Sequence, residues 1–183
     1  TWYGDAVGTG DVDRYLLLSP YHFDSAVAEL FWTLCSGGAL VLPPPGGERD
    51  VSARADLVAR AGVTHTLCLP SVWELVLEVA APGQLGSLRA VIVAGEACAP
   101  SLARTHAAAL PDAALVNEYG PTEGTVWATA HVVDATDESR SVPIGRPIPG
   151  ASVHLVDAAL RPVPRGAPGE VLLGGAGVAR GYF

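Results

Sequence analysis

The segment VNEYGPTEGTVWAT, residues 116–129, places polar side chains directly after an apolar run. Within it, Thr122 and Glu123 offer a hydroxyl and a carboxylate just beyond a turn. A carboxylate oxygen is the hard ligand that Mg2+ prefers, and a hydroxyl can donate a hydrogen bond to a phosphoryl oxygen. These residue types therefore indicate a site for a phosphate or a metal ion, provided that other polar groups converge on the same place.

The surrounding sequence alternates short apolar runs with stretches whose apolar residues recur at helical spacing. This alternation predicts an α/β fold, in which a parallel sheet is covered by helices. We predict strands over 14–20, 39–45, 63–70, 88–95 and 114–120, and helices over 24–38, 51–62, 71–80 and 100–110. From about residue 125 only short apolar runs remain, separated by Pro- and Gly-rich turns. We therefore expect an α/β subdomain at 1–124 and then the start of a β-rich subdomain at 125–183, truncated at its C-terminus.

Polar residues follow four of the predicted strands. In an open parallel sheet the carboxyl ends of the strands share one edge, and ligands bind there. Taken singly, Asp24 or Ser25 could cap a helix, Glu96 could be a solvated carboxylate and Tyr119 could pack in a turn. Their joint position at one sheet edge instead predicts a binding site. The residues concerned are Asp24, Ser25, Glu96, Tyr119, Thr122 and Glu123.

The composition argues against several classes of function. The 183 residues carry 11 basic and 19 acidic side chains, a formal charge of −8, so binding to nucleic acid or to an anionic membrane is not expected. No apolar stretch reaches the roughly 20 residues of a membrane span, and we expect a cytoplasmic protein. The chain contains neither Lys nor Met, so chemistry that requires a lysine ammonium is incomplete here, and we expect a piece of a longer protein.

The cysteine and histidine residues show no metal-ligand spacing. Cys35, Cys68 and Cys98 lie far apart inside apolar runs, which predicts reduced, buried thiols and neither a disulfide framework nor a metal knuckle. The five His residues are scattered as well. We expect no zinc site.

Four segments resemble motifs of one enzyme family. NEYGPTEGTVWAT (117–129) resembles the Asn-x-Tyr-Gly-Pro-Thr-Glu signature of adenylate-forming enzymes, in particular the amino-acid adenylation domains of nonribosomal peptide synthetases. GEVLLGGAGVARGYF (169–183) is similar to the family's Ala-Arg-Gly-Tyr motif, and FDSAVAELFWTLCSGGALVL (23–42) is similar to its Phe-Asp-x-Ser helix. SVPIGRPIPGASVHLVD (141–157) is typical of its linker. The similarity covers nearly the whole chain in order.

This resemblance implies that an α-amino acid is activated by ATP, with Mg2+, to an aminoacyl-adenylate and then transferred to the phosphopantetheine thiol of a carrier-protein domain. Tyr119 would stack on adenine, Asn117 would bond its exocyclic amine, Thr122 would contact the α-phosphate and Glu123 would ligate Mg2+. Thr122 and Glu123 would thus be the catalytic residues. The nucleotide site would comprise Gly95, Glu96, Ala97, Asn117, Glu118, Tyr119, Gly120, Pro121 and Thr122.

The same resemblance implies an amino-acid site in which Asp24 binds the α-ammonium group, a charge-assisted contact. The other positions of this site would be Ser25, Ala28, Leu67, Ile92, Ala94, Glu118, Val126 and Trp127. Glu118 is costly in an apolar pocket unless it is paired, so it predicts a substrate side chain with a donor, such as a phenol, an amine or a ureido group. The alternative is that Glu118 points away from the pocket.

Other interpretations remain at this point. The family's phosphate loop would lie before residue 1, and its ribose-binding Asp and catalytic Lys after residue 183, so we expect these residues alone to be inactive. An acyl- or aryl-CoA ligase of the same superfamily is disfavoured by Asp24, whereas an excised, non-catalytic binding module is favoured only by the truncation. A generic dinucleotide-binding domain is excluded because no Gly-x-Gly-x-x-Gly follows a first strand.

Overall fold

The computed structural model describes residues 11–47, 50–137 and 139–183. The first ten residues of the predicted α/β subdomain therefore lie outside the described part. Strands and helices alternate along the first part of the chain, and only strands and one short 3-10 turn, η1, follow. The elements are β1 (Arg14–Leu16), α2 (Asp24–Cys35), β2 (Ala39–Val41), α3 (Val51–Ala61), β3 (His65–Cys68), α4 (Pro70–Val79), β4 (Ala90–Ala94), α5 (Pro100–Ala109), β5 (Ala114–Tyr119), η1 (Thr122–Gly124), β6 (Thr129–Val132), β7 (Arg146–Pro147), β8 (Ala151–Val156) and β9 (Glu170–Gly175).

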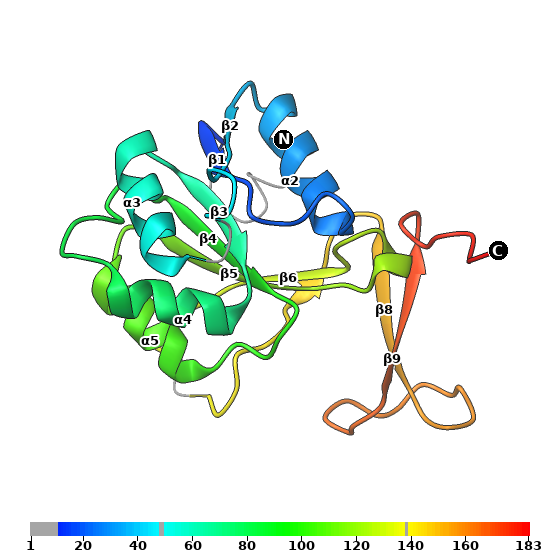
Figure 1. Ribbon diagram of the computed structural model, residues 1–183. Helices are drawn as coiled ribbons and strands as arrows, with labels where there is room; N and C mark the ends of the chain where they lie inside the picture. Colours follow the sequence, from blue (N-terminus) through cyan, green and yellow to red (C-terminus); the bar gives the residue numbers. More distant parts are fainter. Residues whose placement is uncertain (1–10, 48–49, 138) are drawn as a thin grey trace.

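The described strands form a seven-stranded sheet and a separate two-stranded sheet (Figure 1). The large sheet has the order β2-β1-β3-β4-β5-β6-β7 and is parallel from β2 to β5. β6 and β7 continue it in the antiparallel direction, while β8 and β9 pair only with each other. The predicted α/β class is confirmed, with a sheet that is mostly parallel. The boundary at 124/125 stays a prediction, and β6 and β7 beyond it extend the first sheet.

Local sequence explains where the helices begin and end. The Asp50 side chain accepts a hydrogen bond from the Ala53 backbone N–H at 3.1 Å and caps α3, and Gly62 ends that helix in the left-handed conformation at φ 61°. Pro70 and Pro100 begin α4 and α5, where a missing N–H is tolerated. These signals keep the connections short, so each helix returns the chain to the start of the next strand.

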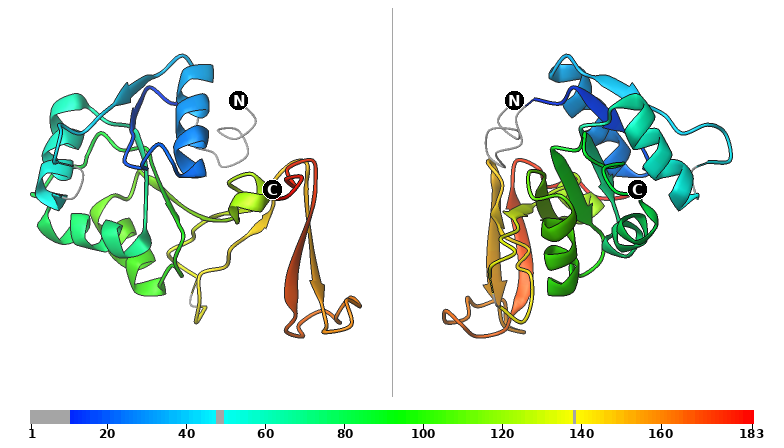
Figure 2. Two further views of the ribbon diagram at one scale, coloured as in Figure 1. Left: turned by 45° about the vertical axis from the view of Figure 1, so that its right-hand side comes forward. Right: turned by 90° about the vertical axis from the view of Figure 1, so that its left-hand side faces the viewer.

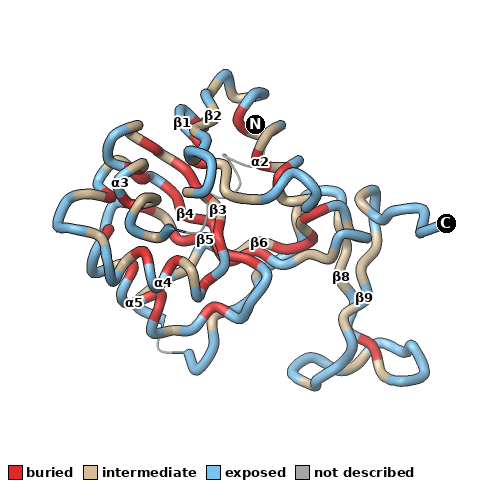
Figure 3. Tube along the Cα trace, in the orientation of Figure 1, coloured by how far each residue is buried: buried red, intermediate tan, exposed pale blue. Residues whose placement is uncertain are grey.

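The main core lies on the face of the sheet covered by α3, α4 and α5, and buried residues run along the central strands (Figure 3). Trp73 of α4 is 1% exposed, and its indole N–H donates to His106 Nδ1 at 3.1 Å. His106 Nε2 donates in turn to the Ala113 carbonyl at 2.9 Å, and burial lowers the pKa of this imidazole. His106 is therefore a neutral core residue, with both ring nitrogens used.

The cysteine prediction was right for bonding and partly wrong for burial. All three Cys are free thiols, but Cys35 is exposed because it occupies the last turn of α2, while Cys68 and Cys98 are buried. Burial raises the pKa of the Cys68 thiol to about 12. Among the described residues, no helix combines the length and the apolar character needed to cross a bilayer.

Candidate functional site

The carboxyl ends of β1, β3, β4 and β5 lie along one edge of the sheet, because these strands are parallel. Adjacent loops at this edge contact each other: Glu96 Oε2 accepts a hydrogen bond from the Ser71 backbone N–H at 3.1 Å. A Cβ added to Gly95, which has φ +84°, would lie 3.0 Å from Leu69 Cδ2. The Glu96 carboxylate thus accepts a hydrogen bond from one of the N–H groups in the first turn of α4 that have no partner within the helix. The sequence did not suggest this structural role.

Helix α2 covers the opposite face of the sheet from α3, α4 and α5. Trp32 of α2 packs against Ile92 and Val116, and its ring lies 5.8 Å from Tyr15 and 5.2 Å from His65. The strand register places four of the predicted amino-acid-site residues on this face: Leu67 pairs with Ile92 and Ala94 pairs with Glu118. The structure therefore brings these residues under the helix that carries Asp24, Ser25 and Ala28.

The start of α2 leaves Asp24 and Ser25 without a capping role. The N-cap residue is Phe23, and no side chain caps the helix. Asp24 is the first helical residue and is partly buried, where its negative charge suits the positive end of the helix dipole. The simpler explanation, a capping side chain, is therefore wrong for both residues.

Glu118 has a buried carboxylate that finds no partner among the described residues. Its side chain is 3% exposed, and neither Oε1 nor Oε2 has a hydrogen-bond partner. Burial raises the pKa of Glu118 well above its usual value. Such a group is stable only as the neutral acid or with a donor beside it. Val116 lies two residues before Glu118 on β5 and therefore on the same face of the sheet. Val116 and its β4 partner Ile92 belong to the apolar cluster beneath α2, so the Glu118 carboxyl lies on the α2 face.

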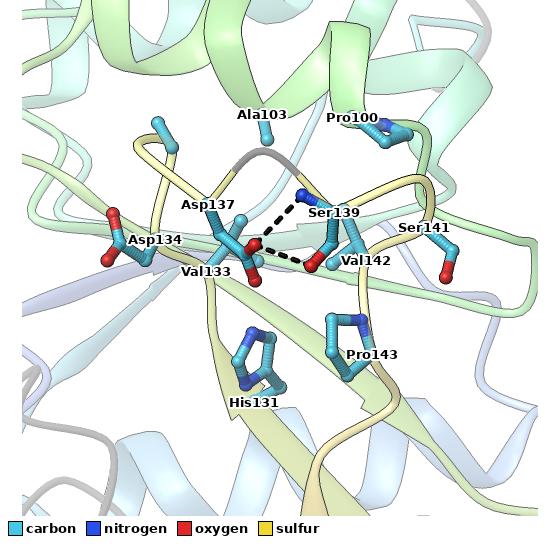
Figure 4. Close-up of a pocket in the computed structure, with 11 residues that line it drawn as sticks. Pro100, Ala103, His131, Val133, Asp134, Asp137, Ser139, Ser141, Val142 and Pro143 are labelled. Atoms are coloured by element: carbon cyan, nitrogen blue, oxygen red, sulfur yellow. Dashed lines mark hydrogen bonds between the residues drawn. The ribbon is translucent and has the colours of Figure 1, made fainter. Parts of the chain in front are cut away.

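Asn117 lies on the other face of β5 and holds a loop. It is 3% exposed, and Nδ2 donates to the Pro143 carbonyl at 2.8 Å. The loop that ends at Pro143 packs against Pro100 and Ala103 of α5 around a cavity of about 10 Å³ (Figure 4). Within it, the Asp137 carboxylate accepts hydrogen bonds from the Ser139 backbone N–H and hydroxyl. This hollow has room for no more than one water molecule, so it is not a substrate site. Because Nδ2 donates to Pro143, the predicted contact of Asn117 with adenine would have to be made by its amide oxygen.

The turn after β5 is a tight reversal that only glycine permits at position 120. A Cβ on Gly120 would lie 2.3 Å from the Val126 carbonyl oxygen, and the Ala128 backbone N–H donates to the Tyr119 carbonyl at 2.9 Å. Thr125 and Val126 have φ of 61° and 71°. Left-handed backbone at two consecutive β-branched residues is strained, and it persists only when the surroundings impose it.

The segment 177–182 supplies that support. The Thr125 hydroxyl donates to the Gly177 carbonyl, and the Ala179 backbone N–H donates to the Glu123 carbonyl at 2.7 Å. The chain end accordingly passes beside η1, on the side toward which the N-terminal end of α2 points (Figures 1 and 2). The Ala-Arg-Gly-Tyr motif is thus bonded to the turn that carries Thr122 and Glu123.

Tyr182 connects two predicted site residues that are distant in the sequence. The pKa of its exposed phenol is raised, first by a hydrogen bond to Glu123 and then by the negative charge of Glu123 and of Asp24. The carboxylates of Asp24 and Glu123 therefore lie on the same side of the molecule. Tyr119 is 37% exposed, so its ring is accessible to a planar group. Thr122 and Glu123 are exposed on η1.

Two predicted pocket residues lie at the margin of this arrangement. Val126 is 8% exposed, within the strained turn. Trp127 lines a cavity of about 180 Å³ between this turn and the β8–β9 sheet, beside Leu173 and Val178. Sequence analysis did not anticipate that cavity. It also missed Glu29, whose carboxylate is 2% exposed beneath α2; its position on the same helix face as Ala26 and Thr33 was the available signal.

Comparison with known proteins finds relatives along the whole chain. Residues 1–183 match the family described as AMP-binding enzyme. The chain is 46% identical over 164 residues to phosphinothricin tripeptide synthetase PhsB of Streptomyces viridochromogenes, covering 90% of this chain and 14% of PhsB.

Solved structures share the fold. The AMPPNP-bound form of the nonribosomal peptide synthetase FmoA3 is 33% identical with a TM-score of 0.90, covering 98% of this chain and 20% of that one. PA1221, a nonribosomal peptide synthetase protein containing adenylation and PCP domains, is 33% identical with a TM-score of 0.84, covering 92% of this chain and 34% of that one. The chain spans a minor part of each relative.

The reversal after β5 can be tested with two glycine substitutions in the complete domain that contains this chain. Gly120→Ala should lower the free energy of unfolding by about 2 kcal/mol or more, because the new methyl group would overlap the Val126 carbonyl. Gly124→Ala is the matched control, since its Cβ would make an ordinary contact at 3.4 Å with Leu173 Cδ1. Denaturant titration measures both, and equal losses would contradict the close approach.

Proposed function

Because the chain belongs to the AMP-binding enzyme family and its relatives are nonribosomal peptide synthetases, we propose that it is the amino-acid-selecting part of an adenylating ligase. The observation that carries the proposal is the parallel pairing of β1, β3, β4 and β5, since Asp24 follows β1 and Glu123 follows β5 at the same edge of the sheet. One carboxylate suits a substrate ammonium and the other suits the phosphate end of ATP. A substrate held between them would have its carboxylate facing the nucleotide.

The proposed reaction has two steps. An oxygen of the substrate carboxylate attacks the α-phosphorus of ATP, the bond from that phosphorus to the bridging oxygen of the β-phosphate breaks, and pyrophosphate leaves. The thiolate sulfur of a carrier domain then attacks the acyl carbon and AMP leaves. A carrier domain is a suitable partner because PA1221 contains adenylation and PCP domains, and ATP is a suitable substrate because FmoA3 has been solved with AMPPNP.

The residues of the β5 turn fit the nucleotide. The accessible ring of Tyr119 could stack on adenine, and the backbone of Gly95, Glu96 and Ala97 is exposed at the neighbouring strand end. The amide oxygen of Asn117 could accept from the exocyclic amine, and the Thr122 hydroxyl could donate to an α-phosphate oxygen. Gly120 and Pro121 hold these groups in the turn.

Glu123 fits Mg2+ by the chemistry of its donor. It is an exposed carboxylate at the phosphate end of the site, and Mg2+ is commonly held by one or two carboxylates together with substrate phosphates and water. The ion, when bound, neutralises the charge that develops on the phosphate oxygens. The Tyr182 phenol lies close to this carboxylate, since Glu123 raises its pKa.

Asp24 and Glu118 select the substrate in this proposal. Asp24 binds the α-ammonium group, and Ser25, Ala28, Leu67, Ile92 and Ala94 surround the side chain, with Val126 and Trp127 at the margin. Glu118 is buried on the same face without a partner, so a substrate side chain with a hydrogen-bond donor would satisfy it. This is an α-amino acid with a polar or cationic group at the end of its side chain.

The role of Asp24 can be tested by pyrophosphate exchange in the complete adenylation domain. The wild type should exchange with α-amino acids and not with their deaminated analogues, and Asp24→Asn should raise the amino-acid KM by about 10- to 100-fold, the value of a charge-assisted contact. Asp112→Asn is the control, because Asp112 is an exposed carboxylate beyond the far end of α5. Equal exchange with deaminated acids would favour an acyl- or aryl-CoA ligase.

The role of Glu118 can be tested by substrate competition. Glu118→Gln should weaken discrimination in favour of donor-bearing side chains by about tenfold, and Glu118→Ala should shift the preference toward apolar ones. Exchange rates across a panel of amino acids measure both variants. An unchanged ranking of substrates would show that Glu118 does not face the side chain.

These 183 residues by themselves should show no amino-acid-dependent pyrophosphate exchange. The chain has no Lys, so the lysine that the family uses in adenylation cannot come from it. Measurement of exchange with the isolated chain, with the complete domain as the positive control, tests this point. Significant exchange by the isolated chain would contradict it.

A further inference from the structure

A hydrogen-bonded chain connects the interior of the α2 face to the amino-acid site. The Ser25 hydroxyl donates to Ser19 Oγ at 3.0 Å, and the Ser19 hydroxyl donates to Glu29 Oε1. Glu29 is 2% exposed, whereas Ser25 is only partly buried and directly follows Asp24. One end of this series of hydrogen bonds, at Glu29, is therefore buried between α2 and the sheet, and the other end, at Ser25, lies beside the proposed ammonium contact.

We propose that Glu29 is a positioning residue whose protonation state sets, through Ser19, the direction in which the Ser25 hydroxyl points, and hence the affinity for the substrate ammonium group. This inference rests on the proposed function, because it assumes that Asp24 binds an α-ammonium. It assigns a role to a buried carboxyl group that contacts neither substrate nor nucleotide.

The direction of each hydrogen bond follows from the donor inventory. An ionised carboxylate only accepts, so Ser19 must donate to Glu29, Ser25 must donate to Ser19, and the Ser25 oxygen offers only lone pairs to the site. A protonated Glu29 can instead donate from Oε1 to Ser19, which then donates to Ser25 and turns the Ser25 proton toward the site. An ammonium group carries three N–H donors, so it is accommodated by the first arrangement and opposed by the second.

The environment of Glu29 allows both states. Burial raises its pKa to about 8, against hydrogen bonds from the Ser19 side chain and from the backbone N–H groups of Ser19 and Leu18, which lower it. The titratable groups that face Glu29 are Tyr15 on β1 and Cys68 on β3, since the charge of Glu29 raises the pKa of both, while β2 contributes no titratable side chain. His65 packs on the same face against Trp32, and Asp24 lies on α2 itself. Burial raises the pKa of both Tyr15 and Cys68, so these two groups stay neutral where Glu29 titrates.

The test compares the pH profile of the amino-acid KM in the complete adenylation domain between pH 6.5 and 8.5. In the wild type the KM should fall about three- to tenfold as pH rises, because ionised Glu29 turns Ser25 into an acceptor. Glu29→Gln should flatten this profile while leaving the KM for ATP and kcat unchanged. Ser25→Ala should flatten the profile as well. Glu74→Gln is the matched control, since Glu74 is an exposed carboxylate on α4, and it should keep the wild-type profile. A wild-type profile in Glu29→Gln would overturn the proposal.

A second measurement does not depend on activity. Because the pKa of Glu29 is raised on folding, its stabilising contribution is complete below about pH 4.5 and is lost as pH rises to about 8, so the unfolding free energy should fall across this window. Glu29→Gln should remove that fall. Ser25→Ala should move the upper end of the window to higher pH, because the ionised carboxylate loses its indirect donor. If Ser25→Ala leaves this pH window unchanged, the hydrogen bonds through Ser19 do not couple Ser25 to Glu29. That result would count against this inference alone, whichever substrate the enzyme activates.

Discussion

The close approach of Gly120 to the backbone of residues 126–128 is the constraint on which the site depends. It allows the chain to leave β5, form η1 and return as β6 alongside the same strand, so the sheet changes from parallel to antiparallel at this point. The return places Thr122 and Glu123 outside the sheet edge and draws Thr125 and Val126 into left-handed backbone. Segment 177–182 then holds the turn by two hydrogen bonds, so the last residues of the chain contribute to a turn more than fifty positions earlier. A strained loop requires such a contact from another part of the fold.

Two carboxyl groups, those of Glu29 and Glu118, are buried on the α2 face and differ in their hydrogen bonding. Removing a carboxylate from water is expensive by several kcal/mol unless donors replace the water. Glu29 accepts a hydrogen bond from the Ser19 hydroxyl on Oε1, while Oε2 has no partner among the described residues, and burial raises its pKa to about 8. Glu118 accepts no hydrogen bond from the described residues, and the pKa of its carboxyl group rises well above the usual value. The fold thus supplies a hydrogen bond to the first carboxyl group, whereas neither oxygen of the second has a partner among the described residues. This difference is the physical reason for treating Glu118 as a selecting residue and Glu29 as a supporting one.

Much of the fold could be predicted from the sequence, because the strands at 88–95 and 114–120 are nearly continuous apolar runs and only a covered parallel sheet accommodates them. The direction of β6 could not be predicted, since an apolar run does not specify whether its neighbour is parallel. β7 consists of Arg146 and Pro147 and is too short for any periodicity. Most predicted strands and helices were longer than the observed ones, because turn residues such as Ser19-Pro20 and Gly37-Gly38 were included in them, and Pro70, which was predicted to end a strand, begins α4.

The site was predictable where it followed from strand ends and unpredictable where it followed from packing. The rule for parallel sheets indicated that Asp24, Glu96, Tyr119 and Glu123 would meet at one edge. It could not indicate that Phe23 is the N-cap of α2, that Glu96 accepts from Ser71, or that Trp127 faces a cavity beside β9. Glu29 shares a helix face with Ala26 and Thr33, but this spacing does not indicate which groups pack around its carboxylate. Such features depend on what packs against the residue, which one strand or helix does not encode.

The alternation of side chains along β5 separates two tasks that its last residues perform. Asn117 points to one face and anchors the loop at Pro143, Glu118 points to the α2 face, and Tyr119 is exposed at the end of the strand. Because consecutive residues have different neighbours, a change at Glu118 need not disturb the contacts of Asn117 and Tyr119. A helix in this place would bring residues three and four positions apart onto one face and would couple these tasks. The strand end is therefore an arrangement that would allow the selection proposed for Glu118 to change independently of its neighbours.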